Sequence, residues 1–473
     1  MTDAREYLNN LKLDRNTEKF VYSWLMLAMV SLIFAGLFAF LLAMARTPQI
    51  QDILPGKDYF KVALVDHVVL SIVIWFLTFE GVLWALTSSA FSGKKTFSSL
   101  LGIAGITVSA GGTVLIIAPA LFGMGTPIFT NYIPVLDHNI YYSGLILFAA
   151  GLFIFLLNIF ATYAFVKSDS SSPLGAEISG MVVAGISVLT AMICFILAYS
   201  TFPGGMKKAV YLEHFFWGGG HVLQFTHTIG MLVVWLLLAR ITLNVKPLGE
   251  KAAFIIFLIF LIYIAQAPFI FYLQTGGEDA FKEAFTTLMQ YGNGSAVIIM
   301  TVMIVKSLMW LFKGGRIGEK LRSLPWREPG YSALFFSIIL FAAGGIIALF
   351  IRGSNTKIPS HYHGVIGAVT MSFMGLTYYI LPAMRRAIPS PKIARIQPYL
   401  YGIGQLMFVL GMFWAGSHGV ARKTYGAAQG LDNFAKIAGM TLMGIGGLVA
   451  ISGGALFVYN VLFSLLGKKK ALE

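Results

Sequence analysis

The sequence predicts an all-α polytopic membrane protein, a bundle of twelve transmembrane helices. Of its 473 residues, 57% are apolar and only 11% are charged, whereas charged residues make up about a quarter of a soluble domain. Apolar runs of about 20 residues recur along most of the chain, and each is long enough to cross a bilayer as a helix. The connections between these runs are mostly short, which predicts antiparallel packing of successive helices.

The twelve predicted spans follow one another with no soluble domain, low-complexity tract or internal repeat between them. They cover residues 20–45, 61–88, 98–122, 139–166, 176–201, 214–240, 252–274, 284–312, 331–352, 361–383, 396–417 and 436–466. Residues 20–466 are therefore expected to form a single transmembrane domain, flanked by an N-terminal segment, 1–19, and a basic tail, 467–473. The segment 1–19 is polar and lacks the pattern of a cleaved signal peptide.

The basic residues indicate how the helices are oriented. The formal charge of +14 would suggest a nucleic-acid partner in a soluble protein, but here the cations lie in short loops, where they face lipid headgroups and the cytoplasm. Every second connection along the chain lies on the same side of the membrane. The connections on one side hold most of the basic residues, namely the N-terminus, 94–95, 167, 240–251, 313–327, 385–395 and 468–470. We therefore expect a multi-pass protein of the cell inner membrane with both termini cytoplasmic, in contact with membrane lipid and with no nucleic acid.

The single cysteine, Cys194, lies inside an apolar run. One cysteine excludes an intrachain disulfide, a CxxC zinc pair and a covalently attached c-type haem.

The histidines are concentrated at one depth of the predicted bundle. They are His67, His138, His214, His221, His227, His361, His363 and His418. All except His227 fall near the outward-facing ends of their spans, and His227 lies about a turn and a half deeper than His221. A lone histidine in a membrane is most simply explained by a hydrogen bond or an interfacial position. Histidines that face one another from neighbouring helices are the usual way in which a bundle holds haem iron.

His361 and His363 predict two different iron sites. Residues two apart on a helix point roughly 200° away from each other, so this pair cannot bind one iron from the same side. It can serve two haems, one on each face of the span 361–383. His67, at matching depth on the span 61–88, could complete one haem as a six-coordinate, low-spin site, while the other haem would keep an open position.

Four segments resemble subunit I of the haem-copper oxidase superfamily, which includes the large subunits of nitric oxide reductases. They are Asp66-His67-Val68-Val69-Leu70-Ser71, the stretch from Ser360-His361-Tyr362-His363-Gly364 to Leu381-Pro382, the stretch from Gly404-Gln405 to Ala415-Gly416, and Arg422-Lys423-Thr424-Tyr425. The second of these is the most specific. The twelve-helix plan extends the resemblance over essentially the whole chain.

The resemblance implies roles for individual residues. His67 and His363 would be the axial ligands of a low-spin haem, and His361 would be the proximal ligand of a high-spin haem. Arg422 and Lys423 would pair with haem propionates at the outer surface, and the alternative for each is a solvated loop charge. The implied cofactors are two non-covalent haems, whose chemical type the resemblance leaves open.

A glycine-rich segment resembles the one that supplies the first ligand of the family's second metal, which is copper in oxidases and non-haem iron in nitric oxide reductases. It reads Trp217-Gly218-Gly219-Gly220-His221. The glycines permit close approach to a haem or to a neighbouring helix. Four residues after this histidine, where many oxidases have a tyrosine and nitric oxide reductases can have a glutamate, this chain has Phe225.

The chain is a divergent member because it lacks the adjacent histidines that the family carries on its seventh helix. No histidine lies between His227 and His361, and Phe271-Tyr272 stand at the corresponding place. Copper or iron needs three or four good ligands, so a second metal on His221 would require unusual ligands, and otherwise the site is lost. The candidates are Gln224, His227 and Tyr272.

Two charged residues within spans bear on proton transfer. Lys306 lies in the inner half of the span 284–312 and resembles the lysine of an oxidase proton pathway. The alternative is a lysine that snorkels to the inner surface. Glu80, towards the inner side of the span 61–88, is either a proton relay or a polar group with a satisfied contact.

Two functions are consistent with these residues. The first is the haem-binding core subunit of a respiratory membrane oxidoreductase, in which a high-spin haem on His361 reduces dioxygen or nitric oxide, assisted by His221 and Lys306. It implies an outer-side electron-donating subunit of the c-type cytochrome or CuA type, and a quinol donor is also compatible. The second is a non-catalytic dihaem electron-transfer subunit that has lost the second-metal site. A transporter would hold no haem and would leave the His361–His363 pattern unexplained.

Overall fold

The computed structural model describes residues 11, 13–48, 50, 57–168, 174–201, 205, 207–273, 276–310 and 322–469. Among these residues, twelve helices are long and apolar enough to cross a membrane. The predicted all-α, twelve-span architecture is therefore confirmed, with span boundaries displaced by up to seven residues. Five predicted segments lie partly outside the described residues, namely 1–19, 252–274, 284–312, 467–473 and the loop 313–327.

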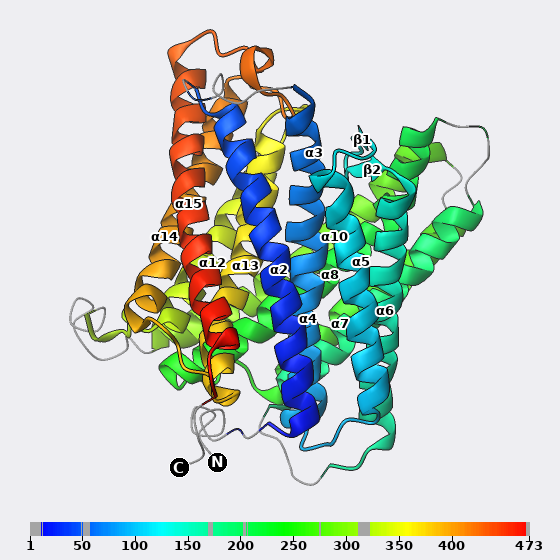
Figure 1. The fold of residues 1–473 in the computed structure, drawn as a ribbon, viewed down its shortest axis with the longest axis vertical. Helices are drawn as coiled ribbons and strands as arrows, with labels where there is room; N and C mark the ends of the chain where they lie inside the picture. The colour runs from blue at the N-terminus through cyan, green and yellow to red at the C-terminus, as the bar shows by residue number, and fades with distance from the viewer. Residues whose placement is uncertain are drawn as a thin grey trace. The chain divides into compact units, whose positions relative to one another are not determined.

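Most spans are single α-helices, but the second contains two π-helical turns. In chain order the helices are α2 (Arg15–Arg46), α3 (Lys57–Val68), η1 (Val69–Ile74), α4 (Trp75–Ala85), η2 (Leu86–Ala90), α5 (Ser99–Leu121), α6 (Asn139–Phe165), α7 (Gly175–Thr201), α8 (Lys208–Leu243), α9 (Glu250–Leu273), α10 (Gly277–Trp310), α12 (Pro329–Ala348), α13 (Lys357–Ala383), α14 (Pro391–Ser417), η3 (Gly426–Gln429) and α15 (Phe434–Leu466) (Figure 1). An antiparallel hairpin of β1 (Thr126–Ile128) and β2 (Val135–Asp137) lies between α5 and α6.

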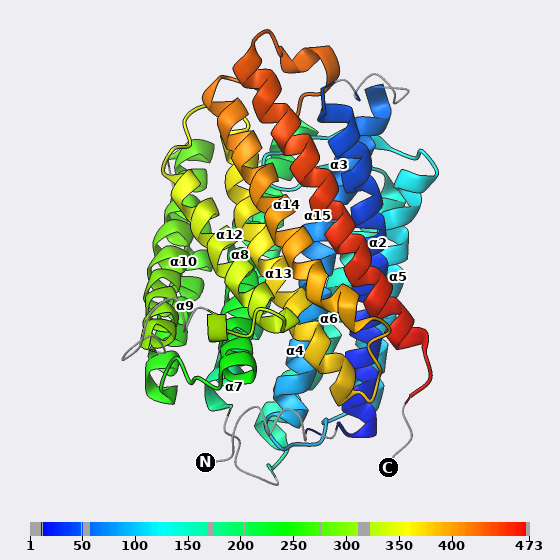
Figure 2. The ribbon, with the colours of Figure 1, turned by 90° about the vertical axis from the view of Figure 1, so that its left-hand side faces the viewer.

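The chain packs as two compact units. Unit 1 comprises Met1–Leu27 and Leu77–Leu324, and unit 2 comprises Ala28–Phe76 and Pro325–Glu473. Unit 1 thus holds α5 to α10, and unit 2 holds α12 to α15 together with most of α2 and the helix that carries His67. In unit 2, α14 and α15 run side by side over most of their length (Figure 2).

Within unit 1, burial does not follow hydropathy. The most apolar stretch of α8 has a mean hydropathy of 1.8 and is 94% buried, whereas that of α9 has a mean hydropathy of 2.5 and is 28% buried. A membrane explains this inversion, because lipid favours apolar side chains on the outside and polar side chains are retained where protein surrounds them. The residues of α8 are therefore the natural place to look for chemistry in unit 1.

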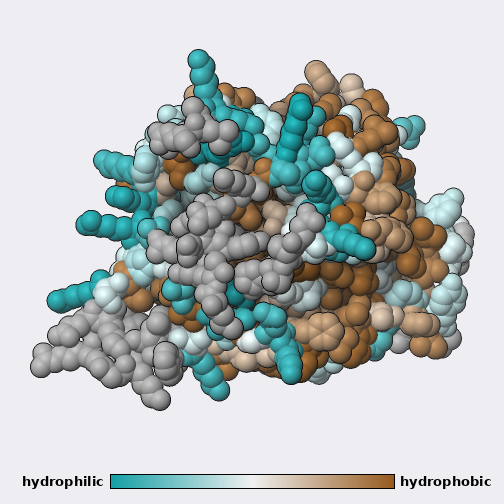
Figure 3. All heavy atoms as spheres, turned by 90° about the horizontal axis from the view of Figure 1, so that it is seen from below, coloured by the Kyte–Doolittle hydropathy of each residue, from teal (hydrophilic) through white to brown (hydrophobic). Residues whose placement is uncertain are grey.

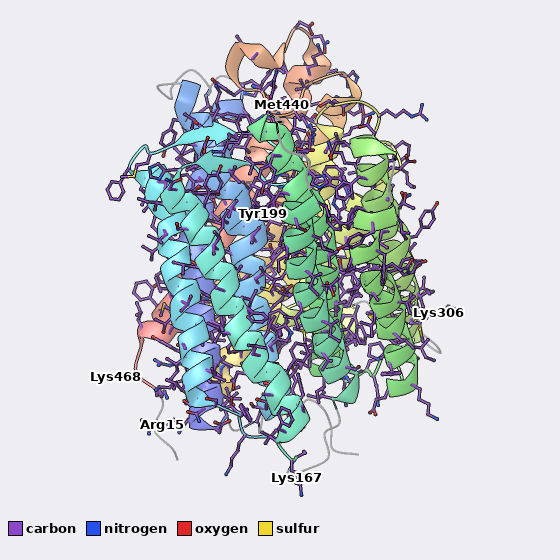
Figure 4. All side chains as sticks on the ribbon, turned by 90° about the vertical axis from the view of Figure 1, so that its right-hand side faces the viewer. Arg15, Lys167, Tyr199, Lys306, Met440 and Lys468 are labelled. Carbon is purple, nitrogen blue, oxygen red and sulfur yellow. The ribbon has the colours of Figure 1, made fainter. Side chains whose placement is uncertain are left out.

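The outer surface of unit 1 fits a lipid environment. Large apolar side chains are exposed along its helices, among them Leu100, Phe254 and Ile298. Apolar side chains are prominent on the surface seen from below, interspersed with hydrophilic ones (Figure 3). Arg15 and Lys167 lie at the same end of unit 1 (Figure 4), as their assignment to one side of the membrane requires.

The pairing of α5 with α6 depends on small residues. A Cβ atom added to Gly112 would lie 2.4 Å from the backbone nitrogen of Phe148, and one added to Gly151 would lie 2.4 Å from the backbone nitrogen of Ser109. Such distances are possible only because these glycines let the two backbones touch, which is how small residues drive helix association in lipid.

Gly112→Ala is expected to destabilise the protein by roughly 1–3 kcal/mol, because the added methyl group must push α6 away. The neighbouring Gly111→Ala is the matched control. No atom lies within 4 Å of a Cβ at Gly111, and alanine is the better helix former. Thermal unfolding of both variants in detergent tests this expectation. Equal midpoints for the two would contradict the close packing.

Candidate functional site

Unit 2 contains a cavity of about 640 Å³. Its walls come from α2, the helix α3–η1, α13, α14 and α15, and most of the lining residues are apolar. The polar minority includes His67, His363, Arg46, Arg422 and Lys423. A large apolar cavity with a few converging polar groups is the usual form of a cofactor site.

Within this cavity the imidazole rings of His67 and His363 lie close together and nearly parallel. Their centroids are 6.5 Å apart and their planes differ by 14°. A metal–imidazole bond is about 2 Å long. Two imidazoles that bind one metal ion in line therefore have ring centroids roughly 6 Å apart, once the distance from nitrogen to ring centre is added on each side. The spacing therefore leaves room for one iron between the rings, and the two residues fit a six-coordinate haem.

Hydrogen bonds to backbone carbonyls fix the ring orientation of His67 and His361. Nδ1 of His67 donates to the carbonyl of Ala35 over 3.1 Å, and Nδ1 of His361 donates to the carbonyl of Gly344 over 2.8 Å. In both rings Nε2 is then the nitrogen that carries a lone pair. Metal-binding histidines typically have this arrangement, because the bond at Nδ1 fixes both the tautomer and the ring direction.

His361 lies on another face of α13 from His363. Tyr362 and His363 both line the cavity, whereas His361 does not. The two imidazoles therefore do not line the same cavity. Gln405 of α14 donates from Nε2 to the carbonyl of His363 over 3.0 Å, which ties the ligand-bearing turn of α13 to its neighbour.

Three cations line the cavity. Arg422 and Lys423 are two of them, and Nε of Arg422 donates to Oγ of Ser354 over 3.1 Å. Sequence reasoning missed the third, Arg46, the last residue of α2. Its Nε and Nη2 atoms are buried and have no hydrogen-bond partner among the described residues. The available signal was an arginine at the outer end of a span, against the trend that places cations inside.

In unit 1, His221 packs against two aromatic rings, which also contact each other. The centroid of its ring is 4.7 Å from that of Trp217 and 5.1 Å from that of Tyr132. Its Nδ1 donates to the carbonyl of Trp217 over 2.7 Å, and the hydroxyl of Tyr132 donates to the carbonyl of Gly220. Burial raises the pKa of Tyr132, which lies outside the membrane spans.

The glycines that precede His221 each accommodate an aromatic side chain. A Cβ at Gly218 would lie 2.8 Å from the ring of Phe285, one at Gly219 2.5 Å from the ring of Phe195, and one at Gly220 2.0 Å from the ring of Tyr132. Gly218 and Gly219 therefore approach aromatic side chains of neighbouring helices, and Gly220 approaches a side chain of a loop. Tyr132 comes from the loop between β1 and β2.

Two of the candidate ligands for a second metal, His227 and Tyr272, have other surroundings. His227 bonds to Glu80 through Nδ1 over 2.9 Å, and Tyr272 is 66% exposed. Among the described residues, no group of three or more His, Cys, Asp or Glu side chains could hold a metal ion. Lys306 is exposed on α10 and lies on the outward side of that helix (Figure 4).

The three remaining histidines make local contacts. His138 precedes α6, where its Nδ1 accepts from the backbone nitrogen of Ile140. His214 lies 2.8 Å from Glu278 and stacks on Phe281, and the exposed His418 donates to the carbonyl of Trp414.

Comparisons with known proteins agree with this architecture. The family profile described as cytochrome c and quinol oxidase polypeptide I matches residues 19–450. An uncharacterized protein of Rickettsia prowazekii (strain Madrid E) is 29% identical over 527 aligned positions, which cover 95% of this chain and 97% of the relative. Cytochrome c oxidase subunit 1 of Thermus thermophilus is 22% identical, over 76% of this chain and 68% of the relative.

A solved structure of a heme-copper terminal oxidase dimer is similar in fold. The TM-score is 0.75 at 17% sequence identity, and the match covers 97% of this chain and 86% of the solved chain.

Proposed function

Because this chain belongs to the family of cytochrome c and quinol oxidase polypeptide I, the haem-copper oxidase subunit I family, we propose that it is the haem-binding core subunit of a respiratory membrane oxidoreductase. The observation that carries the proposal is the placement of His67 and His363 in one cavity, with parallel rings 6.5 Å apart. When bound, the haems supply one-electron transfer and, at an open position beside His361, binding of dioxygen or nitric oxide.

Each proposed role in haem binding is assigned to a side chain whose chemistry suits that role. His67 and His363 hold the low-spin haem and His361 holds the high-spin haem. Arg422 and Lys423 pair with propionates, and we add Arg46, because its buried guanidinium nitrogens need an anionic or carbonyl oxygen. The proposed location is the cell inner membrane, with residues 20–466 as one membrane domain and both termini cytoplasmic. An electron-donating subunit of the c-type cytochrome or CuA type, or quinol, acts on the outer side.

A second candidate function is a dihaem electron-transfer subunit without catalysis. Two observations favour it. The described residues contain no cluster of three His, Cys, Asp or Glu side chains able to hold a second metal. Lys306, proposed as part of a proton pathway, is exposed on α10. In the catalytic alternative, His221 would bind a copper or non-haem iron ion together with ligands from outside the usual set.

Metal analysis combined with optical spectroscopy of the purified protein separates these functions. Two haems, carbon monoxide binding and a stoichiometric copper or non-haem iron would support an active oxidase or reductase. Two haems with neither a second metal nor ligand binding would leave the electron-transfer subunit. A protein without haem, after expression with sufficient haem supply, would refute both.

A further inference from the structure

Three helix ends of unit 2 carry basic side chains that the proposed haem contacts leave unused. The segment 384–396 joins α13 to α14 and includes the start of α14, and the segment 460–469 includes the end of α15. Neither segment contains an aspartate or a glutamate. Their basic residues form what we call the basic cluster, namely Arg385, Arg386, Lys392, Arg395, Lys468 and Lys469. None of them lines the cavity of unit 2.

Hydrogen bonds hold these three helix ends together. The buried side chain of Asn460, on α15, accepts from the backbone nitrogen of Ser390 and donates to its carbonyl, each over 3.0 Å. Ser390 caps α14, because its Oγ accepts from the backbone nitrogen of Ile393 over 3.3 Å. Nη1 of Arg386 donates to the carbonyl of Gly467, which joins the end of α13 to the end of α15. Figure 2 shows the start of α14 and the end of α15 at the same end of unit 2.

Arg385 occupies a backbone position that favours glycine. Its φ angle is 58°, in the left-handed region. Its nitrogen donates to the carbonyl of Pro382 over 2.8 Å, and the nitrogen of Arg386 donates to the carbonyl of Leu381 over 2.9 Å. Helices that end with this pair of bonds usually have glycine at the left-handed position, because a side chain is strained there. An arginine kept in this place indicates a use for its side chain.

Lys392 also lies where its charge is unfavourable. It is the second residue of α14, whose first turn contains no acidic side chain. The start of a helix carries partial positive charge and favours anions, so a lysine there is disfavoured unless an anion binds beside it. The cations that follow the ends of α13 and α15 lie where the helix dipole favours them. The positions of Lys392 and Arg385 therefore indicate an anionic ligand.

We propose that the basic cluster binds the phosphate headgroup of an anionic phospholipid. Arginine pairs with phosphate through two parallel hydrogen bonds, and clusters of cations beside a membrane attract acidic lipids. Exposed apolar side chains continue from the cluster along the same helices, since Ile396 is 43%, Phe463 55% and Leu466 66% exposed. Acyl chains would cover these side chains, whereas a free phosphate would not. A headgroup that carries an ammonium would be repelled, because the two segments contain no acidic residue.

Thermal unfolding of the full-length protein, purified in detergent and freed of lipid, tests the proposal. Dioleoyl phosphatidylglycerol should raise the unfolding midpoint, whereas dioleoyl phosphatidylethanolamine and inorganic phosphate should not. Arg385→Gly and Lys392→Gln should each weaken phosphatidylglycerol binding roughly fivefold, measured as the lipid concentration that gives half of the shift. Lys251→Gln is the matched control. Lys251 is likewise an exposed second residue of a helix, α9 in unit 1, and its loss should leave binding unchanged.

Arg385→Gly separates a binding role from a structural one. Glycine relieves the left-handed strain, so without lipid this variant should unfold at the wild-type midpoint or above it. A lower midpoint with unchanged lipid binding would overturn the proposal. Equal stabilisation by both phospholipids, or by phosphate alone, would also overturn it, as would equal weakening in all three variants, which would indicate a diffuse attraction to the surface. If Arg385→Gly does not fold, Lys392→Gln decides between the same outcomes.

Discussion

His67→Ala is expected to abolish the low-spin haem spectrum and to lower the haem content by about half. The variant removes one of two imidazoles whose rings stand 6.5 Å apart in the cavity of unit 2. It also removes the hydrogen bond from Nδ1 to the carbonyl of Ala35, which orients the ring. A haem held by His363 alone would lose its sixth ligand, and the cavity would retain it weakly or not at all. Reduced-minus-oxidised optical spectra and haem extraction measure both effects.

The matched control is His418→Ala. His418 donates from Nδ1 to the carbonyl of Trp414 in a similar way, but it is exposed and lies outside the cavity. This variant should keep the wild-type spectrum and haem content. A low-spin spectrum that persists in His67→Ala would show that another residue is the ligand, and the proposed pairing with His363 would be wrong.

The fold was predictable because lipid imposes a strong and simple constraint on sequence. Each span must be long and apolar, and the structure changes the predicted boundaries by at most seven residues. His67 and His363 could be paired because depth along antiparallel helices is read directly from sequence position. The π-helical turn η1, which begins two residues after His67, could not be predicted, because the sequence there has the same apolar character as an ordinary α-helix.

The features that the sequence did not reveal depend on side chains from distant segments. Tyr132 approaches His221 from a loop whose path no hydropathy pattern defines. Arg46 resembles an ordinary helix-terminal cation until the cavity beside it is known. For Lys306 the depth was accessible from sequence, but the direction of its side chain became evident only from the packing of α10. Glu80 and His227 were each recognised as polar groups within spans, yet their contact became evident only from the packing of α4 against α8.

His361→Ala is expected to remove the high-spin haem and to abolish carbon monoxide binding while leaving the low-spin spectrum intact. The reason is the geometry of α13. His361 lies outside the cavity that His363 lines, and its own ring is fixed by the bond from Nδ1 to the carbonyl of Gly344 over 2.8 Å. Residues two apart on a helix face nearly opposite directions. Loss of one imidazole therefore should not disturb the iron held by the other. Carbon monoxide difference spectra of the reduced protein provide the measurement.

The reciprocal variant, His363→Ala, makes the test decisive. It should lose the low-spin spectrum and keep carbon monoxide binding, the opposite of His361→Ala, even though the two substitutions lie within one turn of the same helix. A general disruption of α13 would instead remove both signals in both variants. Loss of both signals in stably folded variants would mean that the haems do not bind independently, and the assignment of His361 and His363 to separate irons would have to be abandoned. Opposite losses would establish that one short segment, Ser360-His361-Tyr362-His363, divides its two imidazoles between two cofactors.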